Sequence, residues 1–215
     1  MPSKEDKSTK RLIVEGEQDK RVIPELIEAN GIPWKKGNEP VYIKPRGSND
    51  FNSYWISAQL KEAGLTHLGL ILDADDNSST SWQRIRDACL PSIPDIPQEI
   101  PETGLIHITN TGIKFGIWIM PDNRIKGMLE TFLAYMISDE SQPLWKYAQE
   151  VVGESKNRGA EFIDYHHDKA YIYTWLAWQN PPGRQLHNAI QEKILNPQHP
   201  KAQVFITWFK DLYDL

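Results

Sequence analysis

Hydrophobic residues along the chain fall into short continuous runs and into stretches with helical spacing. The runs at residues 11–15, 41–44 and 68–72 are typical of strands buried inside a parallel sheet. Apolar residues recur at helical spacing over residues 22–27, before the stop signal Asn30-Gly31, and further helices are expected before Gly64 and over residues 80–90. This alternation of strand and helix predicts an α/β fold with parallel central strands.

The second half of the chain has a different pattern. Strands are predicted at residues 105–108 and 114–120, and the turn Asn110-Thr-Gly112 between them indicates an antiparallel hairpin at the edge of the sheet. A helix is expected over residues 125–137. From about residue 144 the strand-like runs disappear. We therefore predict a flexible lead-in over residues 1–10, an α/β domain over residues 11–140 and a helical region over residues 141–215 packed on that domain.

The helical region is rich in aromatic residues, and core packing explains them better than stacking on nucleic-acid bases. These residues are Trp145, Tyr171, Tyr173, Trp175, Trp178 and Trp208.

Composition narrows the class of protein. The 215 residues are 40% hydrophobic and 25% charged, as in an ordinary globular protein, and no apolar run approaches the roughly 20 residues of a membrane span. The single cysteine excludes a disulfide framework, and residues 1–10 have no signal-peptide core, so a cytoplasmic location is expected. The net charge of −5 argues against non-specific coating of nucleic acid but allows an enzyme with a local basic groove.

Carboxylates cluster where the central strand ends. Residues 68–72 run directly into Asp73, Asp75 and Asp76. Asp73 and Asp75 are two apart, so they point to the same side of an extended chain, at the edge where open α/β sheets bind ligands. Two neighbouring carboxylates are unfavourable unless they share a cation or a proton, which predicts a site for Mg²⁺ or Mn²⁺. The alternative is a helix cap, a role that suits Asp76 or Asn77.

Other acidic residues should reach the same edge. Glu15 ends the first predicted strand, and Asp122 follows the last one. Pro121-Asp-Asn123 is also an ordinary turn sequence, so turn formation is the alternative for Asp122. For Glu130, the alternative to a metal-binding role is a position on the solvated face of its helix.

Basic residues that could hold phosphate lie near this edge. Lys44 and Arg46 follow the second strand, and Lys126 and Lys169 could reach the site if the helical region folds over it. The alternative for each is an ordinary surface position.

Two segments together resemble the Toprim domain, which is shared by topoisomerases, bacterial primases, small ribonucleases, recombination proteins and OLD-type (overcoming-lysogenization-defect) nucleases. They are Val14-Glu15-Gly16-Glu17-Gln18-Asp19 and Leu72-Asp73-Ala74-Asp75. Residues 120–130, 169–178 and 181–184 are similar to small stand-alone bacterial Toprim proteins. The resemblance thus covers nearly the whole chain and implies a Toprim, Rossmann-like sheet.

The resemblance also implies roles for single residues. Glu15 matches the Toprim glutamate, a general acid/base or metal ligand, and Asp73 and Asp75 match the metal-binding pair. Asp19 and Glu130 match metal-binding positions of OLD-type nucleases. The chain is too short for the gate and tyrosine domains of a topoisomerase, and it lacks the zinc-ligand cysteines and polymerase body of a primase. The expected activity is therefore Mg²⁺- or Mn²⁺-dependent cleavage of DNA or RNA, with Lys126 and Lys169 as further catalytic candidates.

Two rival functions remain open. A haloacid-dehalogenase-like phosphatase also carries Asp-x-Asp after a buried strand, but Asn77 stands where threonine or valine is usual, the motif normally lies near the N-terminus, and Glu15-Gly16 is left unexplained. The other is an inactive Toprim-like module with a regulatory or defence-associated binding role. The sequence leaves open a protein partner or a homo-oligomer.

Overall fold

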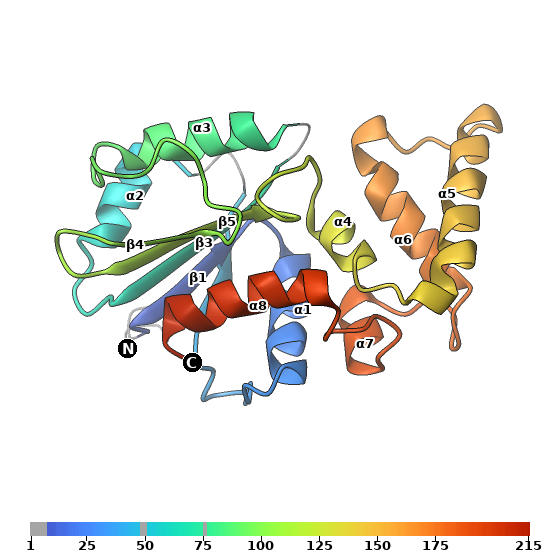
Figure 1. The fold of residues 1–215 in the computed structure, drawn as a ribbon, viewed down its shortest axis with the longest axis horizontal. Coiled ribbons are helices and arrows are strands. Elements are labelled where there is room, and N and C mark those ends of the chain that lie inside the picture. The colour runs from blue at the N-terminus through green and yellow to red at the C-terminus, as the bar shows by residue number, and fades with distance from the viewer. Residues whose placement is uncertain (1–7, 48–50, 75–76) are drawn as a thin grey trace.

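The computed structural model describes residues 8–47, 51–74 and 77–215. A five-stranded sheet with strand order β2-β1-β3-β5-β4 lies at its centre (Figure 1). The strands are β1 (Lys10–Val14), β2 (Tyr42–Pro45), β3 (His67–Asp73), β4 (Leu105–Ile108) and β5 (Lys114–Met120). Neighbouring strands are parallel except β4, which pairs antiparallel with β5. The predicted α/β fold, with parallel central strands and an antiparallel edge hairpin, is therefore confirmed.

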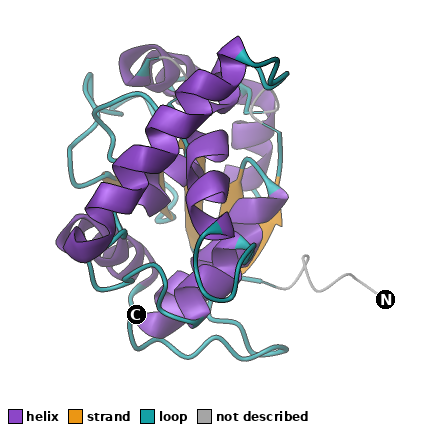
Figure 2. Ribbon diagram, turned by 90° about the vertical axis from the view of Figure 1, so that its right-hand side faces the viewer, coloured by secondary structure: helices purple, strands orange, loops and turns teal. Residues whose placement is uncertain are grey.

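Helices cover both faces of this sheet. The described α-helices are α1 (Glu17–Ala29), α2 (Ser53–Leu60), α3 (Ser78–Cys89), α4 (Leu129–Ala134), α5 (Gln142–Asn157), α6 (His167–Ala177), α7 (Leu186–Gln191) and α8 (Pro200–Tyr213). Short 3₁₀ helices are η3 (Asp139–Ser141) and η4 (Asp164–His166). In Figure 1, α2 and α3 lie over one face of the sheet, whereas α1 and α8 lie over the other. The α5–α6 pair stands beyond the carboxyl ends of the parallel strands and is nearest the viewer in Figure 2.

Two glycines allow α8 to lie close to the sheet. Gly69 on β3 and Gly116 on β5 are partners in the strand register. A Cβ atom at Gly116 would come within 2.6 Å of Leu212 Cδ2, and one at Gly69 would overlap the Tyr213 hydroxyl. The Tyr213 hydroxyl donates a hydrogen bond to the carbonyl oxygen of Arg11 at 2.6 Å. The last helix is thus fixed against the central strands.

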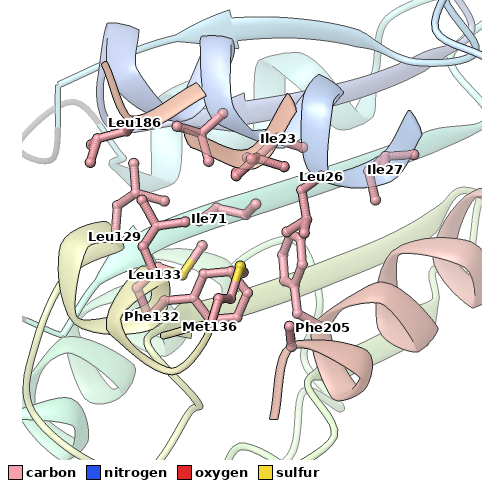
Figure 3. Packing of buried hydrophobic residues seen from close by; sticks show 14 of the residues in the cluster. Ile23, Leu26, Ile27, Ile71, Leu129, Phe132, Leu133, Met136, Leu186 and Phe205 are labelled. Carbon is pink, nitrogen blue, oxygen red and sulfur yellow. The ribbon is translucent and has the colours of Figure 1, made fainter. Parts of the chain in front are cut away.

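The helical region and the sheet share one core. Ile71 of β3, Leu26 of α1, Phe132 of α4, Leu186 of α7 and Phe205 of α8 belong to a single cluster of buried side chains. Figure 3 shows these side chains converging from segments far apart in the sequence. Because residues from both halves complete this core, the relative position of sheet and helices is set by packing.

The aromatic residues of the helical region divide into two groups. Trp175 and Trp208 are fully buried, as core packing predicts. Trp178 is 40% exposed and stacks on Tyr147, with ring centroids 5.5 Å apart and an interplanar angle of 28°. The core-packing expectation is therefore wrong for Trp178.

The helix predicted over residues 125–137 is shorter in the structure, where α4 covers Leu129–Ala134. Turns occupy the preceding residues. Asn123 has a positive φ of 64°, and its Oδ1 accepts a hydrogen bond from the Ile119 N–H at 2.7 Å. Gly127 has a φ of 142°, which is incompatible with helix. Among the described helices, none is long and apolar enough to cross a membrane.

Candidate active site at the carboxyl edge of the sheet

The strand order creates a topological switch point between β1 and β3. From β1 the chain passes through α1 to β2, and α2 then brings it back to β3 on the other side of β1. The two helices lie on opposite faces of the sheet (Figure 1). In open α/β sheets, ligands bind beyond the carboxyl ends of the strands at such a point. Glu15 directly follows β1 and Asp73 ends β3, so the structure brings both to this edge of the sheet.

Asp19 lies in the first turn of α1, just after the carboxyl end of β1. Its Oδ2 accepts a hydrogen bond from the Gly16 N–H at 3.0 Å, and its side chain is buried. Burial raises the pKa of Asp19 to about 6, although hydrogen bonds from the backbone N–H groups of Gly16 and Asp19 oppose the shift. The charge of Glu130 raises this pKa further, and that of Lys169 lowers it. Asp19 and Glu130 therefore lie close enough to repel each other.

Glu130 and Lys169 form an ion pair between α4 and α6. The Lys169 Nζ donates to Glu130 Oε1 at 2.7 Å, and the Glu130 side chain is only 2% exposed. The solvated-face alternative for Glu130 is therefore wrong, because α6 covers this end of α4. Burial alone would lower the pKa of Lys169, but the hydrogen bond to Glu130 and the charges of Glu130 and Asp73 raise it. Lys169 is thus a permanently charged group close to Asp73.

Asp122 stabilises the turn after β5. Its Oδ1 accepts hydrogen bonds from the N–H groups of Arg124 and Ile125, both at 3.1 Å. Its Oδ2 accepts from the Tyr135 hydroxyl at 2.8 Å, and burial together with this bond raises the pKa of Tyr135. These contacts are those of the turn-forming alternative, and they engage both carboxylate oxygens with groups of the protein.

Two of the candidate phosphate-binding cations, Lys44 and Arg46, lie at the carboxyl end of β2, next to the end of β1 that Glu15 follows. Lys44 belongs to β2, and the Arg46 N–H donates to the Val14 carbonyl oxygen at 2.7 Å. The Arg46 guanidinium lies 4.4 Å from the ring centroid of Trp55. Lys126 is exposed in the loop before α4.

Asn77 is the first described residue after the gap that follows Ala74. Asn77 caps α3, since its Oδ1 accepts hydrogen bonds from the N–H groups of Ser79 and Thr80 at 2.9 and 3.1 Å. The cap alternative is thus confirmed for Asn77. Asp75 and Asp76 lie outside the described residues, so their predicted metal-binding and capping roles stay predictions.

Sequence reasoning missed a second connection between α4 and α6. The Thr131 Oγ1 accepts a hydrogen bond from the Met128 N–H at 2.9 Å and donates one to the Asp168 carboxylate. Tyr173 was also missed as a neighbour of the Glu130–Lys169 ion pair. Burial raises the pKa of Tyr173, and the charge of Glu130 raises it further. The spacing of Lys169 and Tyr173, one helical turn apart, was the available signal, because it places both on one face of α6.

Comparison of the sequence with known protein families assigns the chain to one of them. Residues 9–214 match the family described as Protein of unknown function (DUF3226). The chain belongs to this family. No curated protein and no solved structure matches it.

The donor set of this DUF3226 chain suits a hard cation, because it consists of carboxylates at the sheet edge. Within residues 8–47, 51–74 and 77–215, no group of three or more His, Cys, Asp or Glu side chains is arranged to hold a metal ion.

Proposed function

We propose that this protein is a divalent-metal-dependent nuclease of Toprim type that cleaves phosphodiester bonds in DNA or RNA. The observation that carries the proposal is the position of Glu15 and Asp73 at the switch point between β1 and β3, with the charged Lys169 held close to Asp73. Carboxylates and a fixed cation at this edge match the needs of phosphoryl chemistry, which are charge neutralisation and an oriented nucleophile.

Each residue then has a distinct task. Asp73 and Asp75 would hold Mg²⁺ or Mn²⁺, which supplies positive charge to the phosphate oxygens and lowers the pKa of a bound water. Lys169 contributes a second positive charge to the phosphate, and Glu130 positions its ammonium group. Glu15 would take the proton from the attacking water.

Further basic residues extend the proposed binding path. Lys44 and Arg46 lie beside the end of β1 and would hold phosphates next to the scissile one. Asp19 would gain from a nearby cation, because burial disfavours its ionised form.

The phosphatase alternative is less well supported by the topology. In this chain the Asp-x-Asp sequence begins at the last residue of β3, the third strand, and β1 is followed by Glu15-Gly16, for which that mechanism has no role. Turnover of phosphomonoesters without cleavage of nucleic acid would favour it. Binding of nucleic acid without any hydrolysis would favour the inactive binding module.

The first experiment combines calorimetry with a cleavage assay. Manganese binding and cutting of fluorescent DNA and RNA strands are measured for wild type and for the Asp73→Asn, Asp75→Asn double variant. We expect the double variant to lose manganese binding and cleavage, while the control Asp87→Asn, an exposed carboxylate on α3, retains both. Unchanged manganese binding in the double variant would contradict the assigned metal site.

A second variant separates proton transfer from metal binding. Glu15→Gln keeps the side-chain size, and we expect it to lower the chemical step roughly 10²–10⁴-fold while manganese affinity stays nearly intact. Single-turnover cleavage and calorimetry measure the two properties separately. Equal loss of manganese binding would make Glu15 a metal ligand, and full cleavage activity would remove it from the mechanism.

A further inference from the structure

A cavity of about 320 Å³ lies between the loop before α4 and the start of α6. One wall is formed by the loop, including Lys126 and Gly127. The opposite wall is formed by Asp164, Tyr165, His167, Asp168 and Tyr171. The lining thus combines three aromatic rings, one cation and two carboxylates around a space within the size range of small-ligand sites.

Contacts within the protein hold the aromatic wall in place. The His167 Nδ1 lies 2.7 Å from the Asp164 carbonyl oxygen, which fixes the imidazole ring. This ring contacts Tyr171, with centroids 5.7 Å apart, and packs edge-on against Phe162 at 5.2 Å. Tyr171 in turn packs edge-on against Trp145 of α5 at 6.3 Å. A fixed aromatic surface of this kind favours a flat ring as its ligand.

Both walls are connected to the proposed phosphate site. On the loop side, the Gly127 carbonyl oxygen accepts a hydrogen bond from the N–H of Ala74, the residue after Asp73, at 3.0 Å. On the helix side, Asp168 is hydrogen-bonded to Thr131 and precedes Lys169 in the chain. A group attached to a phosphate beside Asp73 and Lys169 therefore has this cavity next to it.

We infer that this cavity binds one unpaired nucleobase of the substrate, so that the enzyme acts on single strands or on strands with an extruded base. The inference rests on the proposed function and adds to it the class of nucleic acid. Stacking requires an exposed base face, which a paired base inside a duplex does not offer. Lys126, exposed at the cavity, would contact the phosphate chain on its way in.

The test measures equilibrium binding by fluorescence anisotropy, with Ca²⁺ in place of Mg²⁺. The probes are labelled oligothymidine and oligouridine, a duplex of the same length, and an abasic strand with the same phosphates. We expect wild type to bind one of the single strands about tenfold more tightly than the duplex and the abasic strand. Tyr165→Ala and His167→Ala should each weaken single-strand binding about tenfold and leave duplex binding unchanged.

The matched control is Tyr147→Ala, which removes a 55% exposed tyrosine on α5 that does not line this cavity. It should bind all probes as wild type does. Equal affinity of wild type for normal and abasic strands would overturn the inference, as would unchanged single-strand binding in both cavity variants. The comparison of normal and abasic strands uses wild-type protein only, so it tests base binding even if a cavity variant misfolds. Failure to bind any nucleic acid would instead overturn the proposed function itself.

Discussion

Two aspartates at opposite ends of the sheet show opposite pKa shifts. Asp19, beside the carboxyl ends of the parallel strands, is buried, and burial raises its pKa to about 6. Asp214, beside the amino ends, is exposed, and hydrogen bonds from Lys114 and His67 lower its pKa to about 2. The fold therefore stabilises the charged form of Asp214 and disfavours that of Asp19.

The surroundings of the two residues explain the difference. Asp214 ends α8 with a positive φ of 52°, and its carboxylate lies 2.7 Å from Lys114 Nζ and 2.9 Å from His67 Nε2. Each of these contacts joins α8 to the sheet. At the carboxyl end, Glu130 and Asp73 both act on the single ammonium of Lys169. Charges at the amino end thus stabilise the fold, whereas the buried carboxylate of Asp19 at the carboxyl end is maintained at a cost, as expected for a group that serves a ligand.

The largest expected effect on stability comes from breaking the buried ion pair. Lys169→Met leaves the Glu130 carboxylate buried without its partner, and we expect the free energy of unfolding to fall by about 3 kcal/mol at pH 7. This is the lower end of the range for buried pairs, because the Lys169 side chain is 41% exposed. Urea denaturation measures the change.

The matched control at the other end is Lys114→Met. It leaves Asp214, whose side chain is 62% exposed, in contact with water, so a much smaller loss than in Lys169→Met is expected. If Lys169→Met and Lys114→Met lowered the free energy of unfolding equally, the difference between the buried ion pair at the carboxyl end and the exposed one at the amino end would be refuted.

A smaller, pH-dependent effect is expected at Asp19. Its pKa in the folded state lies above the unfolded value of 3.8, so ionisation as the pH rises from 4 to 6 costs stability. Asp19→Asn should be more stable than wild type by about 2 kcal/mol at pH 8 and equally stable at pH 3.5. Thermal unfolding across this pH range tests the difference, and a constant gap at every pH would exclude burial of the charge as its cause.

The smallest effect is expected at Asp214. Its pKa is lower in the folded protein, so its contribution to stability is present above pH 4 and is lost as the pH falls toward 2. Asp214→Asn should lower Tm by roughly 1–2 °C at pH 7, and less in high salt, because the group is exposed. A Tm unaffected at pH 7 would show that backbone contacts alone fix the end of α8.

The sequence predicted the sheet well because its strands carry local signals. The hairpin of β4 and β5 has the predicted bounds, since an apolar run, a turn with Gly112 and a second run are all adjacent in the chain. Glu15 and Asp73 were placed at one edge by the rule that parallel strands end together.

The surroundings of Glu130 could not be predicted in the same way. Its partner Lys169 is 39 residues away, and only the docking of α6 on α4 brings them together. The start of α4 was also missed, because the turn at Asn123 and Gly127 depends on backbone angles that helical spacing does not reveal. Long-range packing, rather than local pattern, determines this half of the site.

The close packing of α8 against Gly69 and Gly116 has a consequence for protein synthesis. Leu212 and Tyr213 fill the face above Gly69 and Gly116, and both are synthesised well after the strands that they cover. Until then, the central strands expose an apolar surface on that side. The growing chain must therefore keep a half-covered sheet from associating with its neighbours, and the docking of α8 ends this exposure.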